Sequence, residues 1–194
     1  MALVILLVVI AMAAIWAFKA AHPETAVDLP AYRDAVHLGV NAFTLCLGDQ
    51  LPEKSLATFR RRVESDCEKL GVRLDIAKLA GLRGNLEKFQ IHKQSISRQL
   101  RRQSTRLAAC FELGVTLIAT VFSRDLTLAR GTFDSQLLPA LRNDAQAADV
   151  PWSILEGFIE SLRDPSIDGR KIVDSVLPTV AEKIAASLQG QQDL

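Results

Sequence analysis

The chain has 194 residues, of which 49% are hydrophobic and 23% are charged. This balance excludes a globally disordered chain, and the length is enough for one domain with its own core. The formal net charge of +1 hides a division, because residues 1–106 hold 16 basic and 10 acidic side chains, whereas residues 107–194 hold 7 and 12. The asymmetry predicts that the two halves face different surroundings or face each other.

The first predicted element is an uncharged segment, MALVILLVVIAMAAIWAF, which is followed by Lys19. Its length reaches the lower end of what a membrane-spanning helix needs, and Lys19 can extend the helix by reaching toward the headgroups. Trp16 and Phe18 lie where interfacial aromatic residues are expected. We predict that residues 1–21 form a retained transmembrane signal-anchor. A cleaved signal and a buried core helix are the alternatives, but a signal would have basic residues before its apolar run.

The residues that flank this segment predict its orientation. Only the terminal amine precedes it, whereas Lys19, Arg33 and the basic run 60–62 follow it. Because basic flanks stay in the cytoplasm, we expect a single-pass membrane protein with its C-terminal body in the cytoplasm. The cysteines are too widely spaced for a metal motif and suit buried, unpaired thiols in a reducing compartment. They are Cys46, Cys67 and Cys110.

The rest of the chain reads as all-α. Residues 22–30 contain two prolines and are predicted to be a linker, residues 31–189 a helical bundle domain, and residues 190–194 a frayed tail. Apolar residues recur at helical spacing from Tyr32 to Leu47 and in several later segments. No stretch alternates with a period of two for long enough to indicate a strand.

A heptad-like series runs through the middle of the chain and predicts a coiled-coil seam or one long bundle helix. Since no proline occurs between Pro52 and Pro139, we expect a single long helix, or two helices stacked end to end. A coiled-coil seam would also allow the chain to form a homo-oligomer. The series consists of Leu79, Leu82, Leu86, Phe89, Lys93, Ile96, Leu100, Gln103 and Leu107, and it continues through Cys110, Gly114, Leu117 and Val121.

Residues 107–122 are almost wholly apolar and could form either a membrane span or a core helix. The segment is short for a span and contains Glu112. A carboxylate near the middle of a bilayer costs about 2.5 kcal/mol or more. We therefore predict a central core helix, against which the amphipathic helices pack.

Residues 83–106 are strongly basic, with seven Lys or Arg side chains and one acid, Glu87. The spacing of Arg98, Arg102 and Arg106 predicts a stripe on one helical face. Anionic membrane lipid and an acidic protein surface are the two candidate partners, and a solvated face is the third interpretation. Nucleic acid is not expected, because the region offers one aromatic residue and no known module. The candidate binding residues are Lys88, Lys93, Arg98, Arg101, Arg102 and Arg106.

No catalytic or metal motif stands out in the sequence. Asp34 and His37 share a helical face, but a di-metal bundle needs a second such pair, and we expect neither a metal nor a cofactor. The sequence thus favours a non-enzymatic, membrane-anchored scaffold, adaptor or complex subunit that acts by protein–protein interaction. The alternatives are a peripheral protein that responds to anionic lipid through residues 83–106, and an enzyme without a recognisable motif.

Overall fold

The computed structural model describes residues 29–48 and 53–190, and every regular element in that part of the chain is a helix. The all-α prediction is therefore confirmed. The predicted anchor at residues 1–21 lies outside the described residues, together with its interfacial residues Trp16, Phe18 and Lys19. The elements are α2 (Leu29–Cys46), α3 (Glu53–Lys69), α4 (Ile76–Ala80), α5 (Leu86–Arg101), α6 (Thr105–Ala129), η2 (Phe133–Leu137), α7 (Leu138–Ala147), η3 (Trp152–Leu155), α8 (Glu156–Arg163), α9 (Gly169–Lys171), η4 (Ile172–Val176) and α10 (Leu177–Gly190).

Helices α2 and α6 form the central pair of the domain. A Cβ atom added to Gly39 of α2 would overlap the carbonyl oxygen of Phe111, and one added to Gly114 of α6 would overlap the carbonyl oxygen of Val36. The two backbones therefore touch at reciprocal glycines, as small residues allow when helices cross closely. This close crossing fixes the position of α6 relative to α2.

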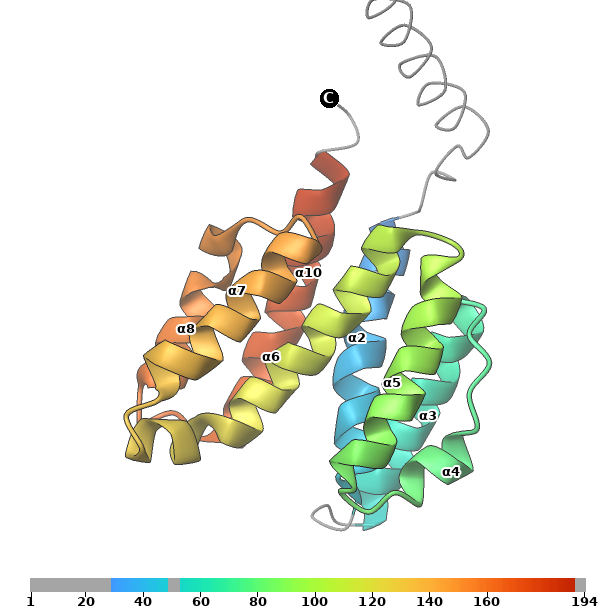
Figure 1. Ribbon diagram of the computed structural model, residues 1–194, viewed down its shortest axis with the longest axis horizontal. Helices are drawn as coiled ribbons and strands as arrows, with labels where there is room; N and C mark the ends of the chain where they lie inside the picture. Colours follow the sequence, from blue (N-terminus) through green and yellow to red (C-terminus); the bar gives the residue numbers. More distant parts are fainter. Residues whose placement is uncertain (1–28, 49–52, 191–194) are drawn as a thin grey trace, which may run out of the picture.

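The other helices surround this pair. Helices α3 and α10 pack against α2, whereas α5 and α7 pack against α6. Figure 1 shows α6 running obliquely between a group formed by α2 to α5 and a group formed by α7, α8 and α10. Each surrounding helix contributes an amphipathic face to one continuous core.

Helix α6 fills the place that the sequence predicts for a core helix. Leu113, Leu117 and Ile118 are fully buried. Among the described residues α6 is the one helix long and apolar enough to cross a membrane, yet 61% of its most apolar window is buried inside the fold. Packing against the neighbouring helices accounts for its apolar character.

The prediction of one continuous helix over the heptad series is wrong, because α4, α5 and α6 are separate helices. A turn at residues 81–84 precedes α5, with Gly84 at a positive φ of 77° and its N–H donating to the Cys46 carbonyl oxygen at 2.7 Å. A second break precedes α6, where the Ser104 hydroxyl oxygen accepts from the Arg106 N–H at 3.2 Å. Such N-caps start new helices, and α5 and α6 pack side by side rather than end to end. The heptad positions Phe89, Ile96, Leu100 and Leu107 are consequently buried within this chain.

The structure also bears on the predictions for the cysteines and for the linker. Cys46, Cys67 and Cys110 are all buried and unpaired, as their spacing predicts. Burial raises the pKa of Cys67 and of Cys110 to about 12, so both thiols stay protonated at neutral pH. Helix α2 begins at Leu29, two residues inside the segment that was predicted to be a linker.

Candidate functional site

Helix α5 has one buried face and one basic face. Its N-cap Asn85 accepts a hydrogen bond from the Lys88 N–H at 3.0 Å, and Glu87 occupies the first turn. Arg98 and Arg101 lie in the last turn, where cations interact favourably with the helix dipole. Phe89, Ile96 and Leu100 point into the core and leave the charged side chains outside.

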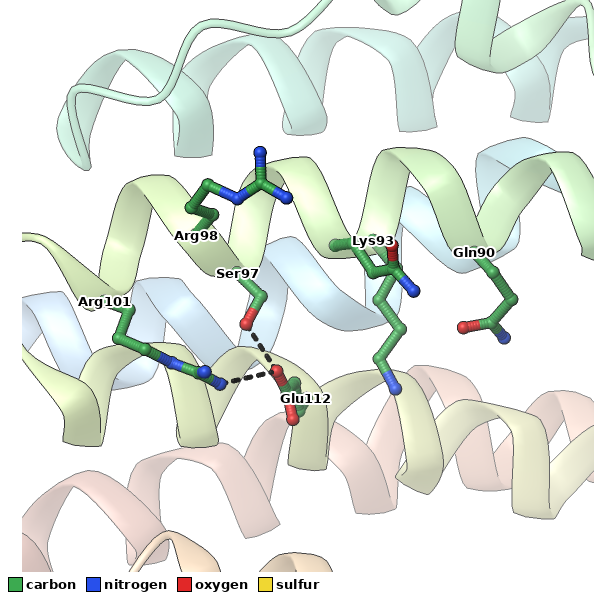
Figure 2. Close-up of a pocket in the computed structure, with 7 residues that line it drawn as sticks. Gln90, Lys93, Ser97, Arg98, Arg101 and Glu112 are labelled. Carbon is green, nitrogen blue, oxygen red and sulfur yellow. Dashed lines mark hydrogen bonds and ion pairs between the residues drawn. The ribbon is translucent and has the colours of Figure 1, made fainter.

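A hollow of about 390 Å³ lies between α5 and α6, and we call it the α5–α6 pocket. Six of its lining residues come from α5 and one from α6. Figure 2 shows Ser97 and Arg101 directed at the same carboxylate, with Lys93 extending from α5 toward α6. The lining residues are Gln90, Lys93, Gln94, Ser97, Arg98, Arg101 and Glu112.

Glu112 is the acidic centre of the pocket. The Ser97 hydroxyl donates a hydrogen bond to Glu112 Oε1, and a guanidinium nitrogen of Arg101 lies 3.5 Å from the same oxygen. The side chains of Arg101 and Glu112 are 62% and 31% exposed, so this ion pair contributes little to stability. It nevertheless holds the Arg101 guanidinium over the pocket.

The predicted stripe of Arg98, Arg102 and Arg106 does not form. Arg98 lies in α5, Arg102 is the residue after its last turn, and Arg106 lies in the first turn of α6. A guanidinium nitrogen of Arg106 is 2.9 Å from Asp149 Oδ2, so the acidic half of the chain already neutralises this cation. The break before α6 separates the three residues because it turns the chain back on itself.

The structure gathers three of the six candidate binding residues in one place. Lys93, Arg98 and Arg101 line the α5–α6 pocket, whereas Lys88, Arg102 and Arg106 do not. Within the described part of the chain, Lys93 and Arg98 make no ion pair, so the pocket holds three cations against the single carboxylate of Glu112. The surplus positive charge suits recognition of an anion, and arginine can hold a carboxylate with two parallel hydrogen bonds.

Sequence reasoning missed Ser97 and Glu112 as members of the site. Ser97 lies among the buried residues of α5, and Glu112 interrupts the apolar run of α6. Buried polar side chains need hydrogen-bond partners, so a single polar residue on each of two apolar helix faces indicates that these two residues contact each other. Their pairing depends on the α5–α6 packing, which the expected continuous helix excluded.

The side chains that line the pocket carry two amides, one hydroxyl, three cations and one carboxylate. Ser97 donates to a carboxylate, and the residues that line the pocket include no imidazole to activate this hydroxyl. Comparisons of the chain with protein-family models, with curated proteins and with solved structures find no match. The geometry of the pocket is therefore the basis on which a function can be assigned.

Proposed function

We propose that the chain is a membrane-anchored helical adaptor or complex subunit that binds an acidic segment of a partner protein through the α5–α6 pocket. The observation that carries this proposal is the set of three cations around one carboxylate in a hollow. An external carboxylate in the pocket would neutralise the surplus charge through charge-assisted hydrogen bonds. Membrane attachment rests on the apolar sequence of residues 1–21, and the basic flank of that segment supports a cytoplasmic body.

The shape and composition of this surface favour a protein partner over a lipid bilayer. A hollow can surround a single side-chain carboxylate, whereas a bilayer is flat and reaches the outermost side chains first. Ile91 of α5 is 68% exposed. It lies about one helical turn after Lys88 and about two turns before Arg98. Apolar side chains next to arginines are common in protein interfaces.

Partner capture with matched variants tests the proposal. The full-length chain, extracted in mild detergent from cells that express it, is compared with Lys93→Gln/Arg98→Gln. The control is Arg60→Gln/Arg61→Gln, which removes the same charge from the exposed face of α3. The pocket variant should lose a stoichiometric partner that the control retains, and that partner should be released by rising salt. Equal recovery from both variants would contradict the role of the pocket.

Anionic lipid remains the second candidate and has its own test. The full-length chain is placed in nanodiscs of neutral lipid and in nanodiscs with added anionic lipid, and amide hydrogen exchange is measured. Protection of α5 in anionic nanodiscs alone, lost in Lys93→Gln/Arg98→Gln, would favour a lipid-responsive function. Identical exchange in both would leave the protein partner as the preferred occupant.

A further inference from the structure

A second hollow lies where α3 and the η4–α10 segment flank α2. Its volume is about 310 Å³, and we call it the Asp66 pocket. Five apolar residues form most of its wall, and four polar residues come from α2 and α3. The lining residues are Val40, Phe59, Val173, Leu177 and Pro178, with His37, Asn41, Arg62 and Asp66.

Asp66 is the unusual residue of this pocket. It is only 5% exposed, and its side chain accepts one hydrogen bond from the described residues, from Asn41 Nδ2 to Oδ2 at 2.8 Å. In the described part of the chain no cation lies within ion-pair distance of this carboxylate. Lys69 instead lies 3.7 Å from Asp34, and the Arg62 guanidinium lies over the ring of Phe59 at 5.5 Å.

Asp66 and Asn41 each keep one side-chain oxygen that accepts no hydrogen bond from the described residues. No buried side-chain nitrogen or oxygen in the described residues lacks a hydrogen-bond partner. Because no hydrogen bond from the described residues reaches Asp66 Oδ1 or Asn41 Oδ1, both oxygens must be reachable from the surface. Both residues line the pocket, so it offers two acceptors within a hollow whose walls are mostly apolar.

We propose that the Asp66 pocket binds a small organic cation, a primary amine with a short apolar body. The ammonium group donates hydrogen bonds to Asp66 Oδ1 and Asn41 Oδ1, and the apolar body packs against Phe59, Val173 and Leu177. A buried carboxylate without a counter-ion is unfavourable, and a bound ammonium supplies the pairing that the fold lacks. Apolar walls with a few convergent polar groups are typical of small-molecule sites.

The surrounding charges allow a cation to bind. One cation lines the pocket itself: the Arg62 guanidinium lies over the Phe59 ring at 5.5 Å and makes no ion pair with Asp66. Two further basic residues of α2 and α3, Arg33 and Lys69, both lie against Asp34, at 3.2 and 3.7 Å. Glu182 of α10 lies 3.3 Å from Arg33. Burial, together with the nearby Arg33, lowers the pKa of His37, which is therefore uncharged at neutral pH and does not repel a cation.

A metal ion fits this pocket less well than an amine does. The described residues contain no group of three or more His, Cys, Asp or Glu side chains that could hold one. An amine needs only one carboxylate and one neutral acceptor, and the pocket provides both. Binding also requires Asp66 to be ionised, although burial raises its pKa to about 6.

Benzylamine is a suitable probe, and benzyl alcohol is its neutral control of similar shape. Both are titrated into the full-length chain in nanodiscs of neutral lipid, with methyl-labelled Val and Leu observed by NMR. Benzylamine should shift the methyl signals of Val40, Val173 and Leu177 saturably at neutral pH, and benzyl alcohol should bind at least about tenfold more weakly. At about pH 5, one unit below the pKa of Asp66, the affinity for benzylamine should fall about tenfold.

Variants then assign the effect to the carboxylate. Asp66→Asn keeps the shape of the side chain and should reduce benzylamine affinity at least about tenfold, whereas Glu64→Gln, at an exposed position of α3, should leave it unchanged. Val173→Phe should block the pocket without altering the carboxylate, and it serves as a second test if Asp66→Asn disturbs the methyl spectrum. Absence of saturable shifts, or equal binding by benzyl alcohol or by Asp66→Asn, would overturn the proposal. Because the α5–α6 pocket lies on other helices, this result is independent of partner binding there.

Discussion

Replacement of Asp66 by Asn should stabilise the protein at neutral pH. Burial raises the pKa of Asp66 from 3.8 to about 6, and its hydrogen bond from Asn41 compensates only in part. Each pKa unit corresponds to about 1.36 kcal/mol, so ionised Asp66 reduces the free energy of unfolding by up to about 3 kcal/mol. Asn can still accept the hydrogen bond from Asn41, so the substitution removes this cost while keeping the contact.

The sign of the pH dependence follows from the raised pKa. Folded protein binds the Asp66 proton more tightly than unfolded protein, so Asp66 is most favourable below the unfolded pKa of 3.8, and this contribution is lost as the pH rises through about 6. The stability advantage of Asp66→Asn should therefore be small near pH 4 and grow to its full size above about pH 6. His37, whose pKa is lowered, affects both proteins equally and cancels in the difference.

Urea unfolding of a chain shortened to residues 24–194, followed by circular dichroism, measures this difference. Variant and parent are compared at several pH values between about 4 and 7. Glu64→Gln removes an exposed carboxylate from the same helix, and its difference from the parent should stay within about 0.5 kcal/mol throughout. A constant difference between Asp66→Asn and the parent across this range would refute the idea that Asp66 is desolvated in the fold.

Four further predictions concern the core and the membrane. Gly39→Ala should cost about 1 to 3 kcal/mol or more of unfolding free energy, because its Cβ meets the α6 backbone, whereas Gly157→Ala has open space and should be neutral or stabilising by thermal melting. Leu117→Ala, at a fully buried position, should cost about 2 to 5 kcal/mol, and a smaller loss would show that α6 is not the core. The full-length chain should stay with membranes through a carbonate wash, and recovery of mature protein cut near the end of residues 1–21 would contradict the anchor. A thiol reagent that cannot cross membranes should label the three buried cysteines only after the cells are opened and the fold is loosened, and labelling in intact cells would reverse the predicted orientation.

The sequence predicts the helical content and the role of α6 because both depend on local composition. Residues 107–122 are apolar on nearly all sides, and such a helix has to lie at the centre of a globular fold or in a membrane. The extensive burial of α2 is harder to predict. Ala35, Gly39 and Ala42 are small, so they add little to an apolar stripe, yet they let α6 approach the backbone closely.

The connection between α5 and α6 shows why the site could be predicted only in part. Periodicity continues across Ser104, but a single capping hydroxyl and the packing of both helices on one core outweigh it. The basic residues of the pocket could be named from composition. Their partners could not, because the contacts of Arg106 with Asp149 and of Arg101 with Glu112 join residues that only the fold brings together.

These contacts also explain the unequal charge of the two halves. The pairs Arg33–Glu182, Arg101–Glu112 and Arg106–Asp149 each join a cation of residues 1–106 to a carboxylate of residues 107–194. Part of the charge asymmetry is therefore neutralised within the fold, as expected if the two halves face each other. Lys88, Lys93 and Arg98 of α5 make no ion pair with the described residues, and this local surplus of positive charge supports the proposal that α5 faces an external anion.

The two proposed sites should respond differently to solution conditions because they differ in charge and burial. Lys93 and Arg98 are accessible, so their attraction to an acidic partner should weaken over the range in which the Debye length falls from about 10 Å to about 3 Å. Asp66 is buried among apolar residues, where salt screens an ion pair much less. Amine binding should therefore change mainly with pH, and partner binding mainly with ionic strength. Salt-sensitive amine binding would place the cation on the exposed surface of α3 rather than in the Asp66 pocket.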